Sequence, residues 1–209
     1  MKNKMMRLVV LGLLGFCFGG VIAYFETRTD TSAEPSLQPD KEIASVIKPI
    51  SSVGGAFELV SETGDTVTEA TWPGKHKLVF FGFTHCPDVC PAGLEKMASA
   101  LENVPNLRQN IIPLFITVDP VRDTPEVMLE YTDLFDSEII GLTGNQDQID
   151  HVVDAYKVYA AKDAADESIP YQMQHSAYIY LMNPQNELLK VIGSETSVSE
   201  IVDVLKTVF

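Results

Sequence analysis

The sequence predicts an α/β domain whose central mixed sheet is flanked by helices, behind an N-terminal membrane anchor. The wholly apolar run 78–83 and the largely apolar run 114–118 have the length and composition of buried strands. A segment with helical spacing of apolar residues follows each run, so that strands and helices alternate along the chain. Residues 1–25 differ from the rest, because basic side chains precede an uncharged apolar stretch there.

The composition is that of one acidic globular domain. The chain has 209 residues, of which 45% are hydrophobic, and this is enough to bury a core of ordinary size. Its net charge is −14, and its basic residues form no stripe. Because proteins that bind nucleic acids present basic surfaces, we expect no nucleic-acid partner.

Residues 1–25 are expected to form a single-pass transmembrane signal-anchor. The uncharged stretch runs from Leu8 to Phe25, and about 18 apolar residues suffice to cross a bilayer. Lys2, Lys4 and Arg7 precede it, and such basic residues stay on the cytoplasmic side. We therefore expect a protein of the inner (cytoplasmic) membrane, with its domain on the periplasmic or extracytoplasmic side.

Residues 26–50 are expected to be a flexible linker between this anchor and a folded domain at 51–209. They are polar, contain proline and serine, and show no periodic apolar pattern. The alternative for the N-terminal segment is a cleaved signal peptide. Val21-Ile22-Ala23 would then be the cleavage site, although a clear Ala-x-Ala is missing.

The first half of the domain is predicted to contain a hairpin, two buried strands and a helix between these strands. Residues 57–62 and 66–69 flank a Thr-Gly-Asp turn, which is typical of a hairpin. The first apolar run follows, and apolar residues then recur at helical spacing from Pro91 onward. The second apolar run, 114–118, is the next strand.

The second half is predicted to contain three helices, a short strand and another hairpin. Thr124 followed by Pro125 is a strong helix start, and Ser197 with Glu200 forms a capping box for the last helix. In chain order we expect a helix from Thr124, a strand at 139–142, a helix through 149–156, a polar loop at 159–172, a hairpin of 177–182 and 188–192, and the last helix.

Cys86 and Cys90 form a Cys-x-x-x-Cys loop between the first buried strand and its helix. The positive end of a helix dipole stabilises thiolate, which is the form that binds soft metals and performs redox chemistry. The order of elements is also that of a thioredoxin-like fold, where a dithiol follows the strand of the first strand–helix unit. This analogy concerns the fold alone.

Redox and metal chemistry are both compatible with this dithiol. A thioredoxin motif has two residues between its cysteines, and here there are three, which weakens the match to a dedicated oxidoreductase. Two thiolates and one imidazole suit copper in either oxidation state, and zinc acceptably. Of the four histidines, only His85 and His175 are well placed in the proposed fold. We favour His175, because His85 would point away from the site if its neighbour Cys86 points toward it.

Three separated segments closely resemble the Sco/SenC copper proteins. They are Phe81–Pro91, Asp119–Pro125, and His175-Ser176 with Tyr180-Leu181. The resemblance covers roughly residues 54–209. It implies a thioredoxin-like domain that binds one copper ion, as Cu(I) or Cu(II), and that helps to assemble the binuclear copper centre of cytochrome c oxidase. It also implies that Cys86, Cys90 and His175 are the copper ligands.

Two further features are expected near the site. Asp88 is implied to lie close to it, where an outer-shell carboxylate could orient the ligands; the alternative is an ordinary turn residue after Pro87. The loop with Asp119, Arg122 and Asp123 is expected to shape the rim and to meet a partner. Alternatively, Arg122 and Asp123 form a structural ion pair.

The leading hypothesis is a copper metallochaperone rather than an enzyme. Its partners would be the copper-bearing subunit of cytochrome c oxidase, with a copper donor protein and a thiol reductant as further candidates. The alternative is a membrane-anchored thiol-disulfide oxidoreductase that uses Cys86 and Cys90 as a redox-active disulfide and needs no His175. A peroxidase-like activity is weaker, because no obvious catalytic base stands beside either cysteine.

Overall fold

The computed structural model describes residues 52–136, 138–163 and 171–209. The predicted anchor at 1–25 and the linker at 26–50 lie outside these residues. Within the described part of the chain, no helix has both the length and the apolar character that crossing a membrane requires.

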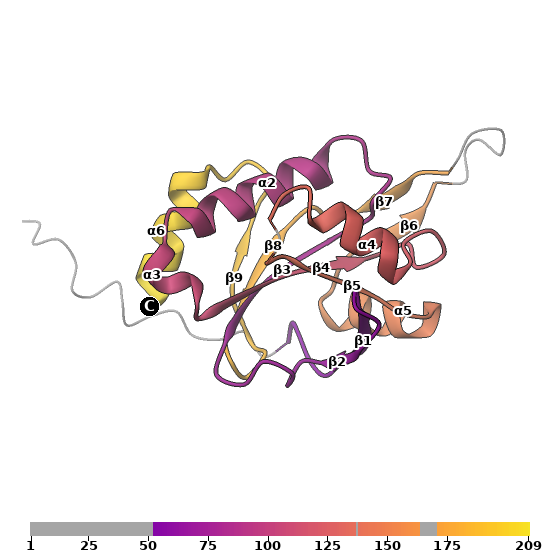
Figure 1. Ribbon diagram of the computed structural model, residues 1–209, viewed down its shortest axis with the longest axis horizontal. Helices are drawn as coiled ribbons and strands as arrows, with labels where there is room; N and C mark the ends of the chain where they lie inside the picture. The colour runs from indigo at the N-terminus through magenta and orange to yellow at the C-terminus, as the bar shows by residue number, and fades with distance from the viewer. Residues whose placement is uncertain (1–51, 137, 164–170) are drawn as a thin grey trace, which may run out of the picture. The chain divides into compact units, whose positions relative to one another are not determined.

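The core of the domain is a seven-stranded mixed sheet with the order β2-β1-β5-β4-β3-β8-β9. Strands β3, β4 and β5 run parallel, and the other pairs are antiparallel, so the predicted mixed sheet is confirmed. The strands are β1 Glu58–Ser61, β2 Thr66–Thr68, β3 His76–Gly82, β4 Ile111–Thr117, β5 Ile140–Thr143, β8 Ile179–Met182 and β9 Leu188–Ile192 (Figure 1).

The two central strands are apolar because helices cover both faces of the sheet. Phe80 and Phe115 lie on one face, where Phe80 packs against Gly93 and Phe115 against Tyr131. Phe81 points to the other face and contacts Tyr156. Strands that are buried on both faces have continuous apolar sequences, which is why these two strands could be predicted from the sequence.

Five helices surround the sheet in the described residues. They are α2 Val89–Glu102, α3 Pro105–Arg108, α4 Pro125–Thr132, α5 Gln146–Ala155 and α6 Val198–Val208. The caps predicted for two of them are confirmed: the Thr124 side chain accepts from the Val127 amide, and Ser197 forms a capping box with Glu200. The short helix α3 was not predicted, and α2 begins at Val89 rather than at Pro91. Pro91 is tolerated there because amides in the first helical turn need no partner within the helix.

The predicted polar loop at 159–172 contains one strand near its start, and a second strand that was not predicted follows directly after it. Strand β6, Ala160–Lys162, pairs with β7, Met173–His175, in a separate antiparallel sheet. We call this pair the β6–β7 ribbon. Each strand has only three residues and neither alternates apolar with polar side chains, so periodicity could not reveal them.

Lys77 is a charged residue at a fully buried position of β3. Its side chain is fully buried, and its ammonium group has no hydrogen-bond partner among the described residues. Burial lowers the pKa of Lys77, and the nearby Glu69 carboxylate opposes this only in part. A buried, unpaired amine is a cost to folding that an apolar side chain of similar length would not carry.

We expect Lys77→Met to raise the free energy of unfolding by about 1–3 kcal/mol at neutral pH. Because the pKa of Lys77 is lower in the folded chain, the unfolded chain binds more protons at mildly alkaline pH, and wild-type stability should rise with pH there. Urea titrations at two pH values measure both effects. The rise should be smaller in Lys77→Met than in the wild type, because only the contribution of Lys77 is removed, while Lys190→Met, on the exposed part of β9, should keep the wild-type rise. Equal or lower stability of Lys77→Met would contradict the prediction.

Candidate metal centre

Cys86, Cys90 and His175 converge at the carboxyl end of β3. Their ligand atoms all lie within 4.8 Å of one another, and no other such group of three occurs among the described residues. The Cys90 Sγ is 3.2 Å from His175 Nε2. Both cysteines are reduced and buried, whereas His175 is half-buried. The structure thus brings together the three residues that the sequence selected from different parts of the chain.

The dithiol loop is shaped by the end of β3 and the start of α2. Cys90 occupies the first turn of α2, and its backbone amide donates to the Cys86 sulfur at 3.4 Å. This places Cys86 at the positive end of the helix, as predicted. Gly82 lies directly against the Cys90 sulfur. A Cβ atom at this position would lie 2.7 Å from Cys90 Sγ and 2.7 Å from Phe115 Cε2.

His175 is the last residue of β7, and its ring is oriented by its neighbours. Nδ1 lies 3.2 Å from the Ser176 carbonyl oxygen, which can only accept a hydrogen bond. The proton of the neutral ring therefore belongs on Nδ1, and Nε2 turns its lone pair toward the sulfurs. The Phe83 ring meets the imidazole edge-on with centroids 5.8 Å apart, and Phe80 lies at 6.5 Å.

The two thiols differ sharply in acidity. The hydrogen bond from the Cys90 thiol, with help from the backbone amides of Asp88 and Cys90, lowers the pKa of Cys86 to about 4, against the opposing effect of burial. The same interaction with Cys86, together with burial, raises the pKa of Cys90. Cys86 is therefore the thiolate of the metal-free site, and Cys90 keeps its proton.

Asp88 and His85 flank the loop without joining the three-residue group. The Asp88 side chain is exposed and does not cap α2, so its contribution to the Cys86 thiolate is made by its backbone amide. His85 is exposed and turns Nδ1 to the Thr84 hydroxyl. It lies outside the group, as the alternation argument predicted.

The alternative of an ion pair between Arg122 and Asp123 is wrong. Arg122 donates to Asp119 instead. Asp123 is fully buried and accepts from the Thr117 hydroxyl at 2.5 Å and from the Thr84 hydroxyl at 2.6 Å. Burial raises the pKa of Asp123, while these hydrogen bonds oppose the rise. Asp123 thus ties the loop after β4 to the residues just before the dithiol.

Sequence reasoning missed several supporting residues. Phe83 and Thr117 lie in the predicted strands and Thr84 follows the first of them, but only the register of β3 against β4 brings Gly82 opposite Thr117. Tyr171 lies in the segment predicted to be a polar loop, yet its hydroxyl donates to Asp119 at 2.6 Å. Its spacing of four from His175 was the available indication, because residues i and i+4 of an extended segment share a face.

The donor atoms fit a soft metal ion. Two sulfurs and one imidazole nitrogen are ligands preferred by copper and accepted by zinc, and the set contains no carboxylate that would favour magnesium or calcium. The same two sulfurs also lie close enough for thiol-disulfide chemistry. Geometry alone thus supports a metal site and a redox site on the same residues.

Comparison with known proteins identifies relatives of the whole domain. The sequence profile of SCO1/SenC matches residues 47–209. Protein sco1 of Schizosaccharomyces pombe is 37% identical over 181 residues, which cover 85% of this chain and 67% of that protein. A SCO2-like protein of Rickettsia felis is 34% identical and covers 99% of this chain and 98% of its own length. The crystal structure of Arabidopsis thaliana ScoI with copper bound superposes with a TM-score of 0.70 at 39% identity, over 75% of this chain and 98% of that one.

We expect Gly82→Ala to weaken Cu(I) binding at least ~10-fold, because the added methyl group must displace the Cys90 sulfur. Competition with a chromophoric Cu(I) chelator measures the affinity. Gly141→Ala is the matched control: its Cβ would lie 2.9 Å from Met128 Cβ, a similar clash on β5. It should lose stability and keep the affinity. Wild-type affinity in Gly82→Ala would contradict the prediction.

Alkylation should report the low pKa of Cys86. In the reduced, metal-free chain, the rate of its reaction with iodoacetamide should stay level from about pH 8 to about pH 5 and fall only below that, because the thiolate persists. Peptide mass spectrometry separates Cys86 from the other cysteines. In guanidinium the pH dependence of the alkylation rate should be that of an ordinary thiol, with a pKa of about 8.5. The same pH dependence in the folded chain would refute the assignment of a low pKa to Cys86.

Proposed function

The chain belongs to the SCO1/SenC family, and from this premise we propose that it is a copper metallochaperone for the assembly of cytochrome c oxidase. It would bind one copper ion and deliver it to the binuclear copper centre of the copper-bearing subunit. The observation that carries this proposal is the convergence of Cys86, Cys90 and His175 within 4.8 Å. Domains related to this one have been crystallised with copper.

The chemistry of the three donors suits a cargo that changes oxidation state. Thiolates retain Cu(I), and an imidazole helps to accommodate Cu(II). In the metal-free site, one donor is already a thiolate and the His175 lone pair already faces the sulfurs. Only the Cys90 proton has to leave when the ion binds, so binding should release protons and stabilise the domain.

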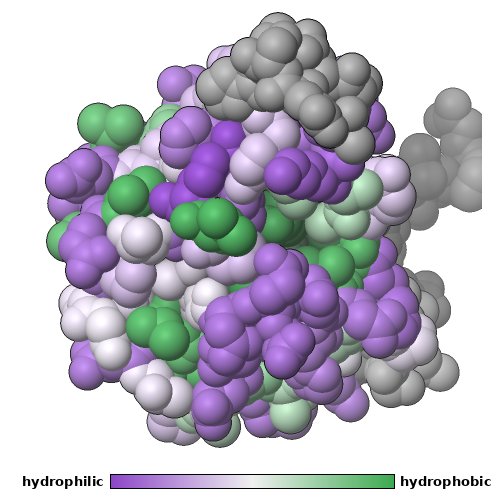
Figure 2. Space-filling model, turned by 90° about the vertical axis from the view of Figure 1, so that its right-hand side faces the viewer, coloured by the Kyte–Doolittle hydropathy of each residue, from purple (hydrophilic) through white to green (hydrophobic). Residues whose placement is uncertain are grey.

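The placement of the site at the surface supports transfer to a partner. Cys86 is 8% exposed, and two large side chains close to the ligands in sequence, Val89 and Tyr178, are each 45% exposed. Figure 2 looks onto the end of the domain where β6 and β7 lie and shows apolar patches between hydrophilic residues. A partner that covers such patches would bring its own ligands next to the ion, as ligand exchange requires.

A thiol-disulfide oxidoreductase remains the second candidate, and one observation favours it. The Cys86 thiolate stands beside the protonated Cys90, which is the pairing of an attacking and a resolving thiol. The target would be the cysteines of the oxidase subunit or of another exported protein. This activity can accompany copper delivery, since the client must be reduced before it accepts the ion.

We also propose that residues 1–25 anchor the chain in the inner membrane and leave the domain on its periplasmic or extracytoplasmic side. The basic residues ahead of the apolar stretch support this orientation. A dithiol in that compartment tends to be oxidised, which supports a thiol reductant as a further partner beside a copper donor protein.

Copper loading of four variants tests the proposal. The wild-type chain should bind one copper with a thiolate-to-Cu(II) charge-transfer band, because thiolate and imidazole donors stand together. Cys86→Ala, Cys90→Ala and His175→Ala should each lose the band and the tight binding, and His85→Ala should keep both. Metal analysis and absorption spectra give the readout.

The oxidoreductase predicts a different pattern. His175→Ala would still exchange with a disulfide substrate, whereas both cysteine variants would not. Failure of the wild type to retain copper, or retention that His175→Ala leaves unchanged, would reject the metallochaperone.

A further inference from the structure

We propose that Arg122 and Tyr171 are positioning residues, which hold the β6–β7 ribbon against the domain and so set His175 beside Cys90. The inference rests on the proposed function, because it concerns how the copper-binding group is assembled. Two of the three donors belong to the loop that leaves the main sheet, but His175 belongs to the ribbon. Its position therefore depends on whatever holds the ribbon in place.

The ribbon has little support of its own. Strands β6 and β7 pair only with each other in the described structure, over three residues each, and Figure 1 shows them at the edge of the domain. At its base, Ser176 N–H donates to the Tyr159 carbonyl, and Tyr159 N–H donates to the Ser176 hydroxyl. A two-stranded ribbon of this length is marginal in isolation, so contacts with the rest of the domain must fix it.

Tyr171 supplies such a contact on the face that also carries His175. Alternate residues of an extended segment point the same way, so Tyr171, Met173 and His175 share one face. Tyr171 and Met173 line one cleft of about 310 Å³ together with residues of the β4–α4 loop and α5. Fixing Tyr171 therefore fixes the orientation of the strand that ends in His175.

Arg122 contacts Tyr171 in two ways. Its guanidinium carbon lies 3.9 Å from the centroid of the Tyr171 ring, and its Nη1 donates to the Tyr171 carbonyl at 2.9 Å. The Tyr171 hydroxyl donates to Asp119 at 2.6 Å, and Arg122 Nε donates to the same carboxylate. The Arg122 side chain is 16% exposed and that of Asp119 3%. Water is thus largely excluded, which strengthens cation–π and charge-assisted contacts.

A second route joins Arg122 to the ligand through Phe83. The guanidinium carbon is 5.7 Å from the centroid of the Phe83 ring. The Phe83 ring in turn meets the His175 imidazole at 89°, with centroids 5.8 Å apart. Arg122 thus contacts Tyr171, two residues ahead of the strand that carries the imidazole, and also the ring that the imidazole packs against. Neither Arg122 nor Tyr171 offers a ligand atom, so both act through His175.

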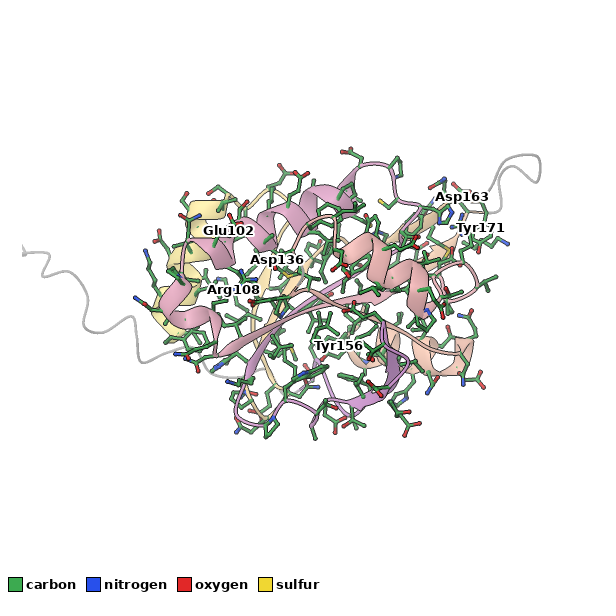
Figure 3. All side chains as sticks on the ribbon, in the orientation of Figure 1. Glu102, Arg108, Asp136, Tyr156, Asp163 and Tyr171 are labelled. Carbon is green, nitrogen blue, oxygen red and sulfur yellow. The ribbon has the colours of Figure 1, made fainter. Side chains whose placement is uncertain are left out.

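The test compares two arginines of similar burial. Arg108 donates to Asp136 at 2.5 Å and to Glu138 at 2.6 Å, and its side chain is 19% exposed. Figure 3 shows Arg108 and Tyr171 at opposite ends of the domain. Arg122→Lys and Arg108→Lys each keep the positive charge and lose the planar guanidinium group with its forked N–H donors. NMR of the His175 imidazole in the copper-free chain is the first readout, and Cu(I) affinity by chelator competition is the second.

We expect Arg122→Lys to shift or broaden the His175 signals and to lower Cu(I) affinity about 10-fold. Tyr171→Ala should do the same, Tyr171→Phe should retain most of the wild-type behaviour through its ring, and Arg108→Lys should change neither readout. Wild-type His175 signals in both Arg122→Lys and Tyr171→Ala would overturn the inference. If the wild-type chain binds no copper, the proposed function fails, while the NMR comparison still decides the inference.

Discussion

The close approach of the Cys90 sulfur to the backbone of Gly82 is the contact on which the site depends. Strand β3 lies between β4 and β8 in the sheet, and Gly82 itself pairs with Thr117 of β4, so the end of β3 is held in place. Helix α2 can begin at Val89 and still bury Cys90 only because residue 82 has no side chain. The start of that helix in turn supplies the amide that reaches Cys86. One small residue at the end of a rigid strand thus fixes both sulfurs.

The two thiols of the site differ in acidity and in burial. Cys86 faces the surface as a thiolate, whereas Cys90 lies against the core and keeps its proton. A metal chaperone can use this difference, because a site that already holds one thiolate has only one thiol left to deprotonate when the ion binds. An oxidoreductase can use it equally well. The dithiol alone therefore does not separate the two functions, and His175 is the residue that does.

Local signals located most of the fold, and the failures lie where neighbours in sequence do not decide the structure. The apolar runs of β3 and β4 and the caps at Thr124 and Ser197 are decided by neighbours in sequence, so they were predicted. The β6–β7 ribbon was missed because strands of three residues carry no periodic pattern. The alternative that paired Arg122 with Asp123 was wrong, because side-chain direction in a loop follows packing rather than spacing.

The sequence by itself determined the chemistry of this protein: two cysteines at a strand–helix junction, and one histidine ahead of a later strand, are soft donors wherever they lie. The tertiary structure decided what those donors can do together. It brought His175 to within 3.2 Å of Cys90, oriented its ring through Ser176, and made the two thiols unequal. These properties arise from burial and from contacts between distant segments, which no local pattern encodes.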